Sequence, residues 1–580
     1  MPGNQQDSLI TQRPEALTLW SLGFLFVVGL SYFQPHLGGD GLSVSYNTFS
    51  WIPFTCLIGI GCLTSVASSS IRYSQLTLGL GLCVLLMLAP ALYPQSQDPF
   101  IQGKLYGLIA GLLLFSALQQ QATDEKFVFD LLFISLLGIL FQSLLAWYLK
   151  YLAPAENVWS FDSDAHLPFG NFRQPNVMGS LLATGLVLAM FLLSHIQDTD
   201  SFSRFRRIAC LLTPLITVPL ILLLNSRVAW LGALIGAGLV LSYLVRSARR
   251  QECIGFLLQS VLGILVGVIL VSSGGEGWSS AVAKLEVDQI RSVFYPQVMS
   301  LILANPFSGV GIGNFEAAFN LYAASLYAAG EPMSGVTNLH HPHNEVLYWA
   351  AEGGAIALLG MLLAAWLVFA SILRVQKPLR LPLIGLFFPI VLHTQTEYPF
   401  YHSIAHWLLF VLFIFVVDAL AKKQRVRRLK STILIGTAGA LIPVTTALFM
   451  ATTLHAASVL RKYETVPGTS PEILYSIVNP MVWRERILWR VRTNLMLGSL
   501  ASGDTSQVQP FIELVEARIQ TMPRKENFQD LIFAYDVLGE SEKAELVFLD
   551  AQYRFPSQEF RRLEGGMVKF QTYSELPEEE

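Results

Sequence analysis

Long runs of apolar residues are the feature that most restricts how this chain can fold. They recur through the first 450 positions, and each is roughly 16–22 residues long, about the length that a helix needs to cross a bilayer. Only 14% of the 580 residues are charged, and the mean hydropathy is +0.50, whereas soluble proteins carry about 25% charged residues. The sequence therefore predicts an all-α polytopic membrane protein.

We predict thirteen spans, of which the eleventh is the shortest. The first span follows a polar segment, Met1–Arg13, and no small-residue cleavage site precedes the second span. We therefore interpret it as a retained anchor rather than a signal peptide. The spans are expected near residues 16–33, 49–68, 75–92, 101–118, 127–149, 176–195, 208–224, 228–245, 253–272, 344–371, 381–394, 403–420 and 431–453.

The basic residues indicate the orientation of these spans, because short inner loops of membrane proteins are rich in Lys and Arg. Every even-numbered loop is basic, whereas the odd-numbered loops carry only scattered charges. This pattern places the N-terminus inside, and it places the odd-numbered loops and the tail after about residue 454 outside. The basic residues of the even-numbered loops are Arg72, Lys126, Arg204, Arg206, Arg207, Arg246, Arg249, Arg250, Arg374, Lys377, Arg380, Lys422, Lys423, Arg425, Arg427, Arg428 and Lys430.

A histidine cluster, residues 338–347, lies at the predicted outer end of the tenth span. It holds three of the ten histidines, followed at once by Asn344 and Glu345. Titratable side chains at the mouth of a membrane helix lose solvation, which favours a functional role over an interfacial polar cap. A zinc site is the competing chemical interpretation, but His341 and His343 flank a proline that scatters their directions. We therefore expect no metal.

Other polar residues are predicted on the same outer face. Gln174 precedes Pro175 at the entrance of the sixth span, where a proline fits the first helical turn. Arg227 lies in the three-residue connection between the seventh and eighth spans, and Arg291 lies in the long outer segment. Glu397 and Tyr398 lie in the loop after the eleventh span. Solvated loops, and an arginine that reaches toward lipid headgroups, are the simpler alternatives.

Together these residue types suit chemistry on a diphosphate. A guanidinium offers paired donors and keeps its charge, so two arginines are well matched to a pyrophosphate. A histidine suits proton transfer near neutral pH, and a Ser or Thr hydroxyl needs a base that takes its proton as the new bond forms. Polar residues gathered outside, rather than at the bilayer midplane, argue against a transporter or flippase.

The long outer segment and the tail complete the predicted organisation. We predict a membrane domain over residues 1–453, a large outer loop over 273–343 within it, and a soluble helical domain over 454–580. Gly309, Gly311 and Gly313 alternate, which predicts a tight loop that returns the chain to the membrane. Helices are expected over 281–303 and 316–335, and residues 528–555 are expected to form two helices around Gly539.

Two stretches of this sequence resemble a known family. His341-Pro-His343-Asn344-Glu345, preceded by Arg291 and the glycine-rich segment 305–315, resembles the O-antigen ligase/polymerase (Wzy_C-type) superfamily. Gly170-Asn171-Phe172-Arg173-Gln174-Pro175-Asn176 is similar to a signature of its protein-glycosylating branch, the pilin-type (PglL-like) bacterial O-oligosaccharyltransferases. The resemblance covers most of residues 16–420, and the tail is similar to the C-terminal domain of that branch.

The resemblance implies a GT-C-like multi-span glycosyltransferase of the bacterial inner membrane with its active site facing the periplasm. The implied reaction is en bloc transfer of an oligosaccharide from undecaprenyl pyrophosphate to Ser or Thr of a periplasmic protein such as type IV pilin, without nucleotide sugar, metal or other cofactor. The alternative is an O-antigen ligase or polymerase that uses a glycan acceptor.

The resemblance also implies roles for individual residues. His343 is expected to be the catalytic residue, and Arg227 and Arg291 are expected to bind the pyrophosphate. Two departures leave the acceptor less defined than the reaction: Gly354-Ala-Ile-Ala357 lacks the last member of an element that often follows the His-Asn pair, and the aromatic residue expected soon after Arg291 is displaced. Residues expected to position the acceptor or the glycan are Gln174, Tyr398, Glu397, Asn344 and His341.

Overall fold

The computed structural model of this chain describes residues 4–35, 38–121, 124–163, 166–196, 201–246, 250–273, 279–333, 335–336 and 338–563. Parts of the predicted outer loop (residues 274–278, 334 and 337) and the end of the predicted tail domain (residues 564–580) lie outside this set. Helices dominate the described residues, so the all-α prediction is confirmed. The chain forms two compact units, which are described in turn.

The first unit comprises residues 1–287, 305–312 and 342–483, and it contains a helix at every position where a span was predicted. Among the described residues, ten helices are long and apolar enough to cross a membrane, which confirms a polytopic membrane protein. Three further helices stand at predicted span positions. The apolar part of the first helix and α4 are shorter than these ten, and α13 begins with the charged residue Lys377. The helices at the thirteen predicted positions are α1 (Asn4–Phe24, continued by the π-helix Leu25–Gly29), α2 (Ser45–Ser68), α3 (Gln75–Leu88), α4 (Gly103–Leu118), α5 (Glu125–Tyr151), α6 (Pro175–Leu193), α7 (Ser201–Leu223), α8 (Arg227–Arg246), α9 (Arg250–Ser273), α12 (Glu345–Ile372), α13 (Lys377–Thr394), α15 (Ile404–Ala421) and α16 (Ile433–Thr465).

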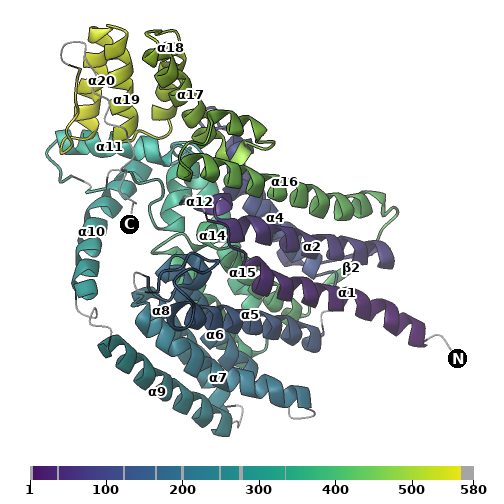
Figure 1. The fold of residues 1–580 in the computed structure, drawn as a ribbon. Coiled ribbons are helices and arrows are strands. Elements are labelled where there is room, and N and C mark those ends of the chain that lie inside the picture. Colours follow the sequence, from purple (N-terminus) through teal and green to yellow (C-terminus); the bar gives the residue numbers. More distant parts are fainter. Residues whose placement is uncertain are drawn as a thin grey trace. The chain divides into compact units, whose positions relative to one another are not determined.

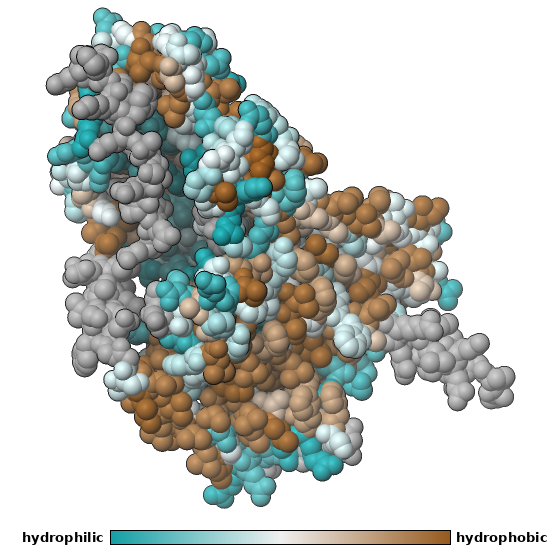
Figure 2. Space-filling model, viewed as in Figure 1, coloured by the Kyte–Doolittle hydropathy of each residue, from teal (hydrophilic) through white to brown (hydrophobic). Residues whose placement is uncertain are grey.

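Helix α6 forms the centre of this unit. Its apolar window is 94% buried, whereas that of α9 is 17% buried. Helices α5, α7, α8 and α13 pack around α6, and α9 packs on the outside of α7 (Figure 1). Hydrophobic residues cover the outer surface of the helices at the lower side of Figure 2, with hydrophilic residues at their ends. This distribution is what a helix bundle surrounded by lipid requires.

Two short strands join predicted inner loops at one end of the unit. Strand β1 (Ser70–Tyr73) pairs antiparallel with β2 (Arg425–Arg428), so the loops after the second and twelfth spans meet. Arg72 also donates to the carbonyl of Gln121, in the loop after the fourth span. At the other end of α2, Asn47 donates to the carbonyl of His402, in a predicted outer loop. Because α2 has 24 residues, these two ends lie about 35 Å apart.

Helix α12 is broken at Gly354, where φ is 61° and ψ is −156°. The loop of residues 305–312 fills the break, because Val310 donates to the carbonyl of Ala351 and Ala355 donates to that of Pro306. A Cβ atom on Gly309 would lie 2.5 Å from the carbonyl oxygen of Glu352, so this approach requires glycine. The glycine-rich segment therefore does more than turn the chain back to the membrane. It supplies hydrogen-bond partners to backbone groups of α12 at the break.

The second unit comprises residues 288–304, 313–341 and 484–580. It contains the end of α10 (Ser279–Ala304), α11 (Phe315–Ala328), α17 (Arg484–Ala501), α18 (Val508–Ile519), α19 (Lys525–Val537) and α20 (Ser541–Arg554). The helices predicted over 281–303 and around Gly539 are confirmed, and that glycine has φ of 74° between α19 and α20. Arg524 pairs with Glu316 at 2.9 Å, which ties α11 to the start of α19.

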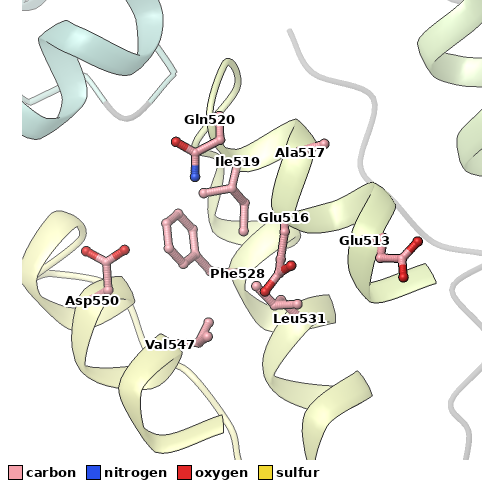
Figure 3. Close-up of a pocket in the computed structure, with 9 residues that line it drawn as sticks. All are labelled: Glu513, Glu516, Ala517, Ile519, Gln520, Phe528, Leu531, Val547 and Asp550. Carbon is pink, nitrogen blue, oxygen red and sulfur yellow. The ribbon is translucent and has the colours of Figure 1, made fainter. Parts of the chain in front are cut away.

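Helices α18, α19 and α20 enclose a shallow cavity in the second unit. Figure 3 shows Glu513 and Glu516 on one wall, Asp550 on the other, and Phe528 and Leu531 between them. The carboxylate of Glu516 accepts a hydrogen bond of 2.5 Å from the hydroxyl of Tyr535. None of the residues that line this cavity was predicted as a site residue from the sequence.

Candidate active site

His343 and Glu397 form the centre of the candidate site. Nδ1 of His343 lies 2.9 Å from Oε2 of Glu397, and the two side chains are 29% and 9% exposed. His343 has φ of 52° in the loop before α12, and Glu397 lies in the loop between α13 and α14 (Pro399–His402). A carboxylate accepts hydrogen bonds only, so Nδ1 donates and the basic lone pair lies on Nε2.

Asn344 fixes the backbone next to His343. It is the N-cap residue of α12, and its side-chain oxygen accepts from the backbone N–H of Leu347 at 3.0 Å. Its amide nitrogen donates to the carbonyl of Gln395 at 3.1 Å. Asn344 thereby connects the start of α12 to the loop that carries Glu397.

Tyr398 packs against the imidazole of His343 in an edge-to-face arrangement, with the ring centroids 5.2 Å apart. His402 also stacks on Tyr398, with the ring centroids 4.4 Å apart. Burial, together with the nearby carboxylates of Asp40 and Glu397, raises the pKa of Tyr398 above its ordinary value. Tyr398 therefore keeps its proton at neutral pH, and its hydroxyl is able to donate a hydrogen bond.

A chain of polar side chains runs from Glu397 to the start of α8. The amide of Asn176 donates to Oε1 of Glu397 at 3.4 Å, and the hydroxyl of Ser226 donates to the side-chain oxygen of Asn176 at 2.7 Å. Arg227 follows Ser226 and is the first residue of α8. The side-chain contacts thus lead from His343 to the residue next to Arg227.

The N-termini of α6 and α8 meet at this point. Gln174 is the N-cap residue of α6 and Pro175 is its first residue, as the sequence predicts. Gly179 allows the close approach, because a Cβ atom there would lie 2.8 Å from Cβ of Ala229. A helix N-terminus carries partial positive charge and attracts anions. Two such ends beside an arginine suit a phosphate group.

Two predicted site residues belong to the second unit. Arg291 lies on α10, and His341 is buried. Their parts in the site therefore stay predictions. The other predicted site residues in the first unit are close to one another in the way described above: Gln174 and Arg227 at two helix starts, and Asn344, Glu397 and Tyr398 around His343.

Sequence reasoning missed several residues of the first unit. Asn176 and Ser226 were not assigned a part, although Asn176 follows Gln174 by two residues and Ser226 directly precedes Arg227. Ser180 lies one helical turn after Asn176, inside the bundle. Its hydroxyl oxygen lies 2.7 Å from Nδ1 of His393 and 2.7 Å from Nε2 of His406. Lys104 of α4 forms a buried ion pair with Glu352 of α12. A lysine at the predicted outer end of a span was the available signal for that pair.

Fold and site together define a multi-pass membrane protein with a polar site at one end of its helix bundle. The family model described as O-Antigen ligase matches residues 212–362, and the one described as Protein glycosylation ligase matches residues 168–193. A third, Virulence factor membrane-bound polymerase, C-terminal, matches residues 381–565. These three matches confirm the predicted resemblance to the superfamily of O-antigen ligases and PglL-like protein glycosylation ligases. No curated protein matches it.

The three matched regions contain the site described above. The first model spans Arg227 and His343, the second spans Gln174 and Asn176, and the third spans Glu397. These families are ligases and glycosylation enzymes, so the protein is an enzyme that transfers glycans. Such an enzyme acts between a lipid-linked glycan donor and a protein or glycan acceptor.

Proposed function

We propose that this protein transfers an oligosaccharide en bloc from undecaprenyl pyrophosphate to a Ser or Thr hydroxyl of a periplasmic protein such as type IV pilin. The proposal places the enzyme in the bacterial inner membrane, with the site facing the periplasm. The observation that carries it is the chain of contacts from His343 through Glu397 and Asn176 to Ser226. This chain leads from a candidate base to the residue that precedes Arg227 at a helix start.

His343 acts as the general base in this proposal. Glu397 accepts the hydrogen bond from Nδ1, which fixes the tautomer and directs Nε2 toward the acceptor hydroxyl. The carboxylate also stabilises the imidazolium that forms when His343 takes the proton. General base catalysis of this kind contributes about 10²–10⁴ in rate.

Arg227 stabilises the leaving group. The acceptor oxygen bonds to the anomeric carbon of the first sugar while the bond from that carbon to the pyrophosphate oxygen breaks. The proton passes to Nε2 of His343, and the electron pair stays on undecaprenyl pyrophosphate. The guanidinium of Arg227 and the N-termini of α6 and α8 stabilise the negative charge that develops on the pyrophosphate. No metal or other cofactor takes part in this mechanism.

The acceptor class rests on residues 168–193, because the model described as Protein glycosylation ligase matches there and includes Gln174. Gln174 and Tyr398 position the acceptor in this proposal. The second candidate function is an O-antigen ligase or polymerase with a glycan acceptor. It is favoured by the matches to the O-Antigen ligase model and to the polymerase C-terminal model.

Co-expression decides between the two functions. The full chain is produced together with a lipid-linked glycan pathway and a candidate pilin, and the intact mass of the pilin is measured. We expect an added mass equal to one complete glycan. An unmodified pilin, together with restored capping of lipopolysaccharide in a ligase-deficient strain, would overturn the protein acceptor and support the glycan acceptor.

A further inference from the structure

The buried ion pair between Lys104 and Glu352 has no part in the mechanism proposed above. Lys104 lies in the first turn of α4, and Glu352 lies on α12 two residues before the break. Their side chains are 5% and 1% exposed. An ion pair taken out of water rarely adds net stability compared with apolar residues of the same size. Its presence inside a membrane bundle therefore calls for another role.

The first part of α12, residues 345–353, is held separately from the rest of that helix. An unbroken helix would bond the N–H of Ala355 to the carbonyl of Ala351. Here the N–H of Val310 donates to the carbonyl of Ala351 instead, and the N–H of Ala355 donates to the carbonyl of Pro306. The N–H of Gly311 donates to the carbonyl of Glu352. The loop of residues 305–312 thus fixes the backbone of this short segment through three hydrogen bonds.

Lys104 adds contacts to the side chains of the same segment. Besides its pair with Glu352, its ammonium lies 4.0 Å from the ring centroid of Tyr348 and 5.2 Å from that of Trp349. The three α12 residues lie within one turn of one another, so a single lysine of α4 contacts the same short segment through one carboxylate and two rings. Such cation–π contacts strengthen when they are shielded from water.

Two paths lead from this cluster to His343. The first is along the backbone: the segment begins at the Asn344 cap, directly after His343. The second is through aromatic rings. The ring centroids of Tyr348 and Tyr401 are 6.2 Å apart, and those of Tyr401 and Tyr398 are also 6.2 Å apart. Tyr398 in turn contacts His343.

We propose that Lys104 and Glu352 are a positioning pair, which holds the first turns of α12 so that His343 faces Glu397. The inference rests on the proposed function for its activity readout only. Neither residue touches substrate. A merely structural pair would be replaceable by neutral side chains of similar size, whereas a positioning pair would not.

The test uses the double variant Lys104→Met/Glu352→Gln in the full-length protein, because removing one partner alone leaves a buried charge and endangers folding. We expect thermal stability close to that of the wild type, a fall of at least tenfold in kcat, and an unchanged KM for the lipid-linked donor. The matched control is Arg207→Met/Glu252→Gln, which removes a pair between α7 and α9. This control should keep the wild-type kcat.

A second readout does not need activity. Diethyl pyrocarbonate labels accessible histidines, and mass spectrometry gives the labelling rate of His343 relative to the exposed His166. We expect this ratio to rise at least threefold in the double variant. If wild-type protein transfers no glycan, the proposed function fails, but the labelling ratio still decides the positioning role.

A folded double variant with kcat within twofold of the wild type and an unchanged labelling ratio would overturn the inference. If the double variant does not accumulate, Glu352→Asp carries the test, since it keeps the charge and shortens the reach to Lys104 by one methylene. That variant should also lower kcat and raise the labelling ratio. Wild-type values for both would contradict the positioning role.

Discussion

Oε2 of Glu397 lies 2.9 Å from Nδ1 of His343, although 54 residues separate the two in the chain. The same carboxylate accepts from Asn176, which contacts Ser226 beside Arg227. One glutamate therefore connects the candidate base with the candidate phosphate-binding end of the bundle. Its replacement therefore tests whether proton transfer by His343 depends on this carboxylate.

Glu397→Gln should lower kcat about 10²–10⁴-fold, because the neutral amide neither fixes the tautomer of His343 nor stabilises its protonated form. The KM for the donor should stay near its wild-type value. Steady-state transfer with purified donor and acceptor measures both constants. Glu125→Gln is the control, since Glu125 forms an exposed pair with Lys422 and such pairs contribute about 0–1 kcal/mol. An equal loss in both variants would remove Glu397 from the mechanism.

Arg227→Lys should weaken use of the donor although the charge is kept, because lysine lacks the paired donors of the guanidinium. We expect a fall of about tenfold in kcat/KM for the lipid-linked donor and a larger fall for Arg227→Gln. Arg246→Lys, at the other end of α8, should leave kcat/KM unchanged. Wild-type kinetics for Arg227→Gln would show that another group binds the pyrophosphate.

Gly309→Ala should destabilise the protein, because its φ is 63° and the added Cβ would lie 2.5 Å from the carbonyl oxygen of Glu352. We expect a loss of about 1–3 kcal/mol from backbone strain alone, seen as a lower unfolding temperature in detergent. Gly238→Ala, in α8, is the matched control, since its added Cβ would meet nothing within 4 Å. An unfolding temperature for Gly309→Ala equal to that of the control would mean that the loop yields to the extra atom.

The sequence specified the bundle well and the site in part. Apolar runs located all thirteen helix positions, because lipid requires continuous apolar helices whatever their neighbours are. His343, Arg227 and Gln174 were predicted as site residues, and in the structure each stands at the start of a helix. Asn176 and Ser226 were missed because a polar residue at a helix start is also an ordinary capping choice.

Two features of the fold become evident only in three dimensions. The pair between Lys104 and Glu352 joins residues 248 positions apart, and the sequence does not show which carboxylate Lys104 pairs with. The break in α12 is also not evident from the sequence, because Gly354 resembles any other small residue of an apolar helix. Its φ of 61° depends on contacts with the loop of residues 305–312.

We predict that Asp530 makes the stability of the second unit depend on pH. Burial, with a further contribution from Glu526 and an opposing one from Arg518, raises the pKa of Asp530 to about 7. The folded state then holds a proton that the unfolded state releases near its ordinary value of 3.8. Stability therefore falls as pH rises from about 4 to about 7. Asp530→Asn should raise the unfolding temperature at pH 8 and change it little at pH 4, and the opposite order would contradict the assignment.

The transfer reaction of His343→Ala tests the central claim most directly. Membranes that contain equal amounts of wild-type or variant protein are incubated with lipid-linked oligosaccharide and acceptor pilin, and the intact mass of the acceptor is followed over time. We predict that the variant accumulates in the membrane but adds no glycan, while the wild type adds one complete oligosaccharide. Transfer by the variant at the wild-type rate would contradict the assignment of His343 as the catalytic base.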